Sequence, residues 1–331
     1  MLTWAPSSLA STREPLREAF TAPSLPGGAE FEARPSSRAL RALESSRRQV
    51  EAGEEGAQIS SSAYGPEQMA EVASVLGGLV HGPELDRLSV YLATPTELEQ
   101  VCGATVVACY SPSRREMFVA GEDRSVAGVS REFAIAHEYG HHIANSQRGD
   151  LLAPMQGGTI RWATHERVCQ LTRAGKLYPG DQDAHYWENP EEAFAQSYAY
   201  LNNPTRMPWQ YASFLRPTLQ SFLEIRADVL SPWQGPTKEV WSGITDASRS
   251  ASRILRTELD GMVSANLEAP SGDALSIGLR DPFSRQVLAR SDAKEGGGAA
   301  IAFANCGRRE LLLEVLGPEP SSPFRMMVAS P

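Results

Sequence analysis

The feature of this sequence that most constrains its fold is a group of histidines between residues 133 and 146, where the chain reads FAIAHEYGHHIANS. Three of the chain's six histidines fall within six residues of this stretch. His137 and His141 are four residues apart, and residues at that spacing lie on one face of a helix. The surrounding residues predict a helix over about 129–145. Two imidazoles on one helix face can bind a single Zn²⁺, which needs further ligands from elsewhere in the fold.

Glu138 directly follows the first histidine, so residues 137–141 fit the pattern His-Glu-x-x-His. A carboxylate at this place can reach a water on the metal without binding the metal, and we expect Glu138 to be the general base. The alternative is an accidental match, expected in on the order of one chain in a hundred of this composition. His142 lies about 100° further around the helix and is predicted to be a buried structural histidine.

A third ligand is expected on a later element, and the segment ENPEEAFAQSYAYL at 188–201 is the best candidate. Asn189 is a typical helix N-cap, which places Glu192 at the third helical position. A Glu at that position also suits a capping box, so a purely structural role is the alternative. Ala195 and Ala199 share a helix face with Glu192, and such small residues favour close packing against the histidine helix.

Other third ligands remain open. Glu191 is the second candidate and Glu188 the third. His165 or His185 would instead give a site with histidine ligands only.

At these residues the chain resembles a known family. The segment AIAHEYGHHI, followed about fifty residues later by NPEEAFAQSYA, resembles the gluzincin-type zinc metallopeptidases, which combine HExxH with a downstream Glu-x-Phe-Ala helix. The resemblance implies that His137, His141 and Glu192 hold one catalytic Zn²⁺ and that Glu138 is the base. It covers about residues 65–235.

Gln196 departs from the family pattern, in which an acid is common at this position. The departure leaves in doubt how the groups around the ligands tune the site, but not which residues bind the metal. The expected fold class is α+β, with a zincin-like metallopeptidase core followed by a small antiparallel β-sandwich.

The resemblance also implies a mechanism and a substrate class, namely protein or peptide. A bound Zn²⁺ lowers the pKa of a water toward ~7 and polarises a peptide carbonyl. Glu138 would take the proton of the water and pass it to the leaving amine. The oxyanion needs a second donor, and we expect it from Tyr186 or His185, just before the second helix. The alternative for Tyr186 is core packing beside Trp187.

The cysteines indicate the cellular compartment in which the protein works. The segment VCGATVVACYSPSRREMFVAG contains two short β-type runs that predict a hairpin, and it resembles the Cys-pair hairpin ahead of HExxH in bacterial neutral zinc metallopeptidases. That resemblance implies a Cys102–Cys109 disulfide; two unrelated buried thiols are the alternative. Cys169 and Cys306 are the remaining pair, although spacing does not establish connectivity. A disulfide implies an oxidising compartment, so we expect a secreted or cell-surface bacterial protein whose signal has been removed.

The composition and the hydrophobic pattern of the sequence predict four regions. Residues 1–60 are rich in Pro, Ser, Arg, Glu and Ala and are predicted to be a flexible lead-in or propeptide remnant. The catalytic domain is predicted at 61–235 and a linker at 236–254. Residues 255–331 hold short apolar runs at nearly even spacing, which predicts a small antiparallel β-sandwich.

This last region resembles bacterial pre-peptidase C-terminal domains, small sandwiches attached to secreted peptidases. The resemblance implies binding of a surface or substrate, or help in secretion; a simple stabilising cap is the alternative.

Charge and hydropathy exclude some functions. A net charge of −9 argues against a general binder of nucleic acid or anionic membranes, because no excess of Lys and Arg is present. No apolar run approaches the length of a membrane span. Two rival functions stay open beside peptidase activity. One is a non-catalytic, metal-stabilised surface-binding or adhesion module, and the other is a zinc hydrolase of a non-protein amide such as a cell-wall peptide.

Overall fold

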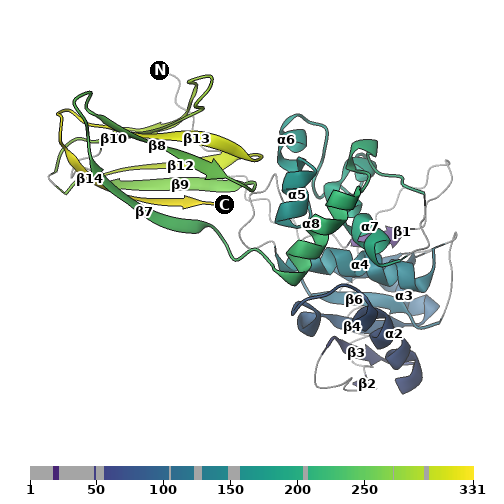
Figure 1. The fold of residues 1–331 in the computed structure, drawn as a ribbon. Helices are drawn as coiled ribbons and strands as arrows, with labels where there is room; N and C mark the ends of the chain where they lie inside the picture. Colours follow the sequence, from purple (N-terminus) through teal and green to yellow (C-terminus); the bar gives the residue numbers. More distant parts are fainter. Residues whose placement is uncertain are drawn as a thin grey trace. The chain divides into compact units, whose positions relative to one another are not determined.

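The computed structural model describes residues 18–21, 48–49, 56–103, 106–122, 129–147, 157–203, 208–270, 272–293 and 298–331. These residues form helices and mixed and antiparallel sheets, so the predicted α+β class is confirmed (Figure 1). The chain divides into two compact units, the first at 1–79 and 83–142 and the second at 80–82 and 143–331.

The first unit contains a six-stranded sheet with the strand order β1-β5-β6-β4-β3-β2. The strands are β1 (Glu18–Thr21), β2 (Arg48–Gln49), β3 (Gln58–Ser61), β4 (Ser89–Ala93), β5 (Val106–Ser111) and β6 (Glu116–Ala120). β4 runs parallel to β3 and β6, whereas β5 and β6 form the predicted antiparallel hairpin. Every residue of β5 and β6 is buried, which accounts for their continuous apolar runs.

The helices of the first unit are α2 (Pro66–Gly78), α3 (Pro95–Cys102) and most of α4 (Arg131–Ser146), which continues into the second unit. α4 is a confirmed prediction, but α3 was not predicted. The hydroxyl of Thr94 accepts from the Glu97 amide at 3.3 Å, and the Glu97 carboxylate accepts from the Thr94 amide at 2.8 Å. In the sequence this capping box appears as Thr-x-x-Glu, a pattern that indicates the start of a helix.

Both cysteine pairs form disulfides, Cys102–Cys109 and Cys169–Cys306. Cys102 ends α3, so the first bridge joins a helix to β5 instead of lying within the hairpin as predicted. Two disulfides are typical of extracellular proteins. Among the described residues, no helix is long and apolar enough to cross a membrane.

The helices of the second unit are α5 (Ile160–His165), α6 (Val168–Arg173), α7 (Pro190–Asn202) and α8 (Leu219–Leu230). α5 and α6 are two separate short helices, because Arg167 between them adopts the left-handed conformation with φ 60°. α7 begins at the predicted residue. Asp228 of α8 accepts from the amides of Arg161 and Trp162 at 2.9 and 3.2 Å and thereby caps the start of α5.

The C-terminal part of the second unit is the predicted antiparallel β-sandwich (Figure 1). One sheet has the order β11-β10-β13-β8 and the other the order β12-β9-β14-β7. Alternate residues of both sheets share one hydrophobic core, which includes Leu255, Val263, Ile277, Leu313 and Met326. The strands are β7 (Thr237–Ile244), β8 (Ser250–Thr257), β9 (Gly261–Glu268), β10 (Ser276–Arg280), β11 (Val287–Ser291), β12 (Ala299–Asn305), β13 (Arg309–Leu316) and β14 (Pro323–Ser330).

The predicted linker at 236–254 is wrong, because β7 and most of β8 lie there and pair with β14 and β13. Many residues of both strands are polar and exposed, and few apolar residues, such as Trp241, pack against the core, so the composition suggested a connection.

The flexible lead-in predicted at 1–60 is also wrong where the structure describes it, since β1 and β2 form the two edges of the sheet and part of β3 pairs with β2 and β4. The remainder of that prediction falls outside the described residues.

Candidate metal centre

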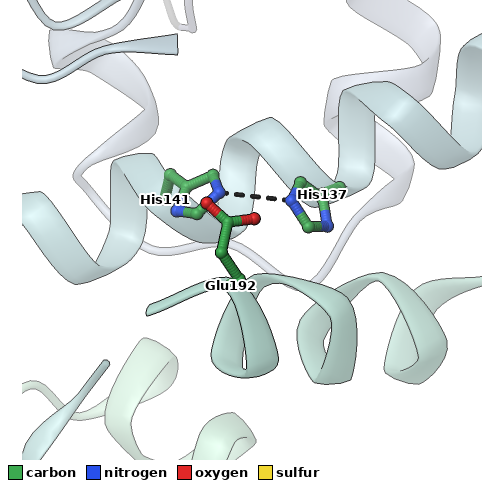
Figure 2. A group of neighbouring side chains, drawn as sticks. All are labelled: His137, His141 and Glu192. Carbon is green, nitrogen blue, oxygen red and sulfur yellow. Dashed lines mark hydrogen bonds between the residues drawn. The ribbon is translucent and has the colours of Figure 1, made fainter. Parts of the chain in front are cut away.

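The two histidines of the HExxH segment face each other across one turn of α4. His137 and His141 are both buried, and their Nε2 atoms lie 3.2 Å apart (Figure 2). A tetrahedral zinc ion with Zn–N bonds of 2.0–2.1 Å holds two ligand nitrogens about 3.3 Å apart. The spacing of these two imidazoles therefore fits a shared metal ion.

Glu192 supplies a carboxylate to the same group. Its carboxylate lies on α7 and points toward the two imidazoles, and the ligand atoms of all three residues lie within 4.8 Å of one another (Figure 2). Within the described residues, the group contains neither Glu191 nor Glu188, and neither of the histidines considered as alternatives, His165 and His185.

The donor set suits a divalent metal. Two imidazoles and one carboxylate form a known ligand set of catalytic zinc sites, which leave a position open. All three side chains are at most 1% exposed. Burying ionisable groups together costs desolvation energy, and a bound cation offsets that cost. The group is thus a candidate site for a metal ion.

The start of α7 explains how Glu192 is presented. The side chain of Asn189 accepts from the Glu191 amide at 3.0 Å, whereas the Asn189 amide donates to the Tyr186 carbonyl at 3.2 Å. In a capping box that amide would donate to the Glu192 carboxylate. Instead, Glu192 accepts from the Tyr186 hydroxyl at 3.0 Å and from the Gln182 side chain at 3.3 Å. The capping alternative for Glu192 is therefore not realised.

The two predicted oxyanion donors have different settings. Tyr186 donates to Glu192 and also packs edge-on against Trp187, with ring centroids 5.1 Å apart. Burial, and next the Glu192 charge, raise the pKa of Tyr186 well above its usual value, so the hydroxyl keeps its proton. The ring of His185 stacks on Tyr178 at 3.7 Å between centroids. For both residues the oxyanion role stays a prediction.

Two further residues of the site region are buried. Glu138 is 0% exposed and follows His137 on α4. Gln196, the departure from the family pattern, is 4% exposed and lies one turn after Glu192 on α7. The role of Glu138 as general base stays a prediction.

His142 holds α4 from another side, as predicted for a structural histidine. Its Nε2 lies 2.9 Å from the Glu84 carbonyl, and its Nδ1 lies 3.0 Å from the Tyr110 hydroxyl. A carbonyl only accepts, so Nε2 carries the proton and Nδ1 accepts from Tyr110. Burial lowers the pKa of His142, in keeping with a neutral ring. Tyr139 adds a bond of 2.9 Å to the Glu84 carboxylate.

Sequence reasoning missed Gln182, Glu84 and Tyr110. Gln182 lies in the irregular segment before α7, where no periodicity marks it. Glu84 and Tyr110 come from separate parts of the chain and meet α4 only in the folded unit, so no local spacing indicates them.

Comparisons with known proteins give little further information. No family model and no curated protein matches the chain. A pre-peptidase C-terminal domain of collagenase from Bacillus anthracis matches 28% of this chain and 86% of its own length, with 11% identity and a TM-score of 0.24. The Yersinia pseudotuberculosis-derived mitogen matches 29% of this chain and 86% of its own length, with 10% identity and a TM-score of 0.24.

A longer match involves IMPa from Pseudomonas aeruginosa, solved in complex with an O-glycopeptide. It covers 83% of this chain but only 37% of IMPa, with 12% identity and a TM-score of 0.22. At such scores these similarities carry no inference about what this chain does.

Proposed function

We propose that this chain is a zinc-dependent metallopeptidase of the gluzincin type that hydrolyses peptide bonds. The observation that carries the proposal is the buried group of His137, His141 and Glu192, whose ligand atoms lie within 4.8 Å of one another. Glu138 stands directly beside the first histidine in the HExxH segment. Without Glu138 beside a ligand, the same three residues would support metal binding but not hydrolysis.

Each residue has a distinct task in this proposal. When bound, a zinc ion activates a water and polarises the substrate carbonyl. His137 and His141 act as neutral ligands, and Glu192 contributes the one negative charge of the ligand set. Glu138 takes the proton of the attacking water and passes it to the leaving amine. Tyr186 or His185 provides a hydrogen bond to the developing oxyanion.

The proposal extends to the rest of the protein. Two disulfides support export to an oxidising compartment, and we place the protein outside the cell or on the cell surface. Protein or peptide is the proposed substrate, and the β-sandwich is proposed to bind a surface or the substrate.

The test compares the wild type with Glu138→Gln on casein, mixed peptides and peptidoglycan fragments. We expect Glu138→Gln to keep its zinc and to lose about 10²–10⁴-fold in hydrolysis. Glu132→Gln, a change on the same helix at a partly exposed position, is the matched control and should keep full activity.

Two other outcomes of this test would favour a rival function. A wild type that binds zinc but cleaves none of these substrates would favour a metal-stabilised binding module. Cleavage of peptidoglycan fragments alone would favour a hydrolase of cell-wall amides.

A further inference from the structure

Glu192 receives one hydrogen bond on each carboxylate oxygen from the segment that precedes α7. The Tyr186 hydroxyl donates to Oε2 at 3.0 Å, and the Gln182 side-chain amide donates to Oε1 at 3.3 Å. A carboxylate oxygen has two lone pairs, and each of these hydrogen bonds uses only one of them. The two donors thus restrain the carboxylate without blocking it.

The segment that carries both donors is itself held firmly. Asn189 accepts from the Gly180 amide at 3.3 Å and donates to the Asp181 carbonyl at 3.1 Å. The Asp181 carboxylate accepts from the amides of Asp183 and His185 at 2.9 and 3.2 Å. These bonds tie residues 180–189 into a closed loop at the start of α7. Gln182 and Tyr186 therefore donate to Glu192 from a segment that its own hydrogen bonds hold in place.

We propose that Gln182 and Tyr186 are positioning residues that orient the Glu192 carboxylate for metal binding. This inference rests on the proposed metal site and adds how its carboxylate ligand is held. Hydrogen-bond partners of metal ligands fix ligand orientation, and their loss costs about 10–100-fold in metal affinity. The bond from Tyr186 is the shorter of the two, so Tyr186 has the larger effect. A tyrosine hydroxyl has one proton to donate, so this role of Tyr186 leaves the hydrogen bond to the oxyanion to His185.

The experiment measures zinc affinity by competition with a chromophoric chelator, for the full chain. We expect about 10–100-fold weaker zinc binding for Tyr186→Phe and a smaller loss for Gln182→Ala. Two changes serve as matched controls and should bind zinc as the wild type does. Tyr178→Phe removes a hydroxyl that donates to the Gly175 carbonyl at 2.9 Å in the same region. Gln220→Ala removes an amide that donates to the carboxylate of Glu224 at 2.8 Å on α8.

A double-mutant cycle separates positioning from a general structural effect. In a Glu192→Ala background, Tyr186→Phe should leave the remaining zinc affinity unchanged, because its acceptor is gone. The melting temperature of the zinc-free protein shows whether each variant is folded. If Tyr186→Phe does not fold, Gln182→Ala decides the question.

Two results would overturn the inference. One is wild-type zinc affinity in both Tyr186→Phe and Gln182→Ala, and the other is an equal loss with and without Glu192. If the wild type binds zinc and hydrolyses peptides while either result is obtained, only this inference fails. A wild type that binds no zinc overturns the proposed function and this inference together.

Discussion

The Nε2 atoms of His137 and His141 lie 3.2 Å apart across one turn of α4. Because a shared metal ion requires both nitrogens, we expect the wild type to bind one zinc per chain. His141→Ala and Glu192→Ala should each lose more affinity than the roughly 10–100-fold that loss of an outer partner costs. Glu191→Ala and His165→Ala should retain zinc. Elemental analysis after dialysis measures the stoichiometry, and zinc loss in Glu191→Ala but not in Glu192→Ala would contradict the assignment.

Zinc should also stabilise the folded chain. A ligand that binds only the native state adds about 2.7 kcal/mol to the free energy of unfolding at a free concentration 100 times its Kd. We therefore expect zinc to raise the apparent Tm of the wild type and a chelator to reverse the rise. In His137→Ala the same zinc addition should leave the Tm unchanged. A comparable rise in that variant would place the stabilising ion elsewhere.

Tyr110→Phe tests the anchoring of α4 through His142. The substitution keeps the ring but removes the donor to the buried Nδ1 of His142. An unsatisfied buried acceptor costs about 1–3 kcal/mol, so the free energy of unfolding in urea should fall by that amount. Tyr178→Phe, at a bond exposed to solvent, should change it by much less. Equal effects from the two substitutions would argue against a special role for His142.

Asp260 should make stability depend on pH. It is 0% exposed, and burial raises its pKa from 3.8 to about 6, although the Gly307 amide donates to it. The folded state therefore binds the proton more tightly than the unfolded state. The stabilisation is fully present below about pH 4 and is lost as the pH rises through 6, by up to about 3 kcal/mol.

Asp260→Asn should remove this dependence, and urea unfolding of both proteins at pH 4 and pH 7.5 measures it. The exposed Asp292, whose pKa is lowered by a hydrogen bond from Arg290, is the control. Its replacement by Asn should leave the loss of stability with rising pH in place. A wild type and an Asp260→Asn protein with parallel pH profiles would show that Asp260 titrates normally.

The two disulfides should differ in their contribution to stability. Cys169–Cys306 joins residues 137 apart, whereas Cys102–Cys109 joins residues 7 apart. The chain-entropy model gives about 5 kcal/mol for the long loop and about 2 kcal/mol for the short one. Replacing each pair by serine and measuring unfolding in denaturant checks the order. A larger loss for the short loop would mean that packing around Cys102 and Cys109 outweighs loop entropy.

Much of the fold could be predicted where the signal is local. The alternation in GMVSANLE places every second residue of β9 inside the sandwich, and the apolar runs at 276–331 all became strands. β7 was missed because half of its residues are polar and none of them is fully buried, and α3 because its Thr-x-x-Glu signal was not used. A local signal that is weak or overlooked does not lead to a correct prediction, even when the helix or strand itself is regular.

The sequence by itself determined the pair of histidines, since the i, i+4 spacing brings two imidazoles to one face of any helix they share. It also favoured the acids around the start of α7 as the third ligand, with His165 and His185 left open. Only the tertiary structure decided that Glu192, not Glu191 or Glu188, joins the histidines, and that Gln182 and Tyr186 donate to its carboxylate. The physical reason is that a helix fixes its own side-chain spacing, whereas contacts between separate segments depend on how their backbones pack.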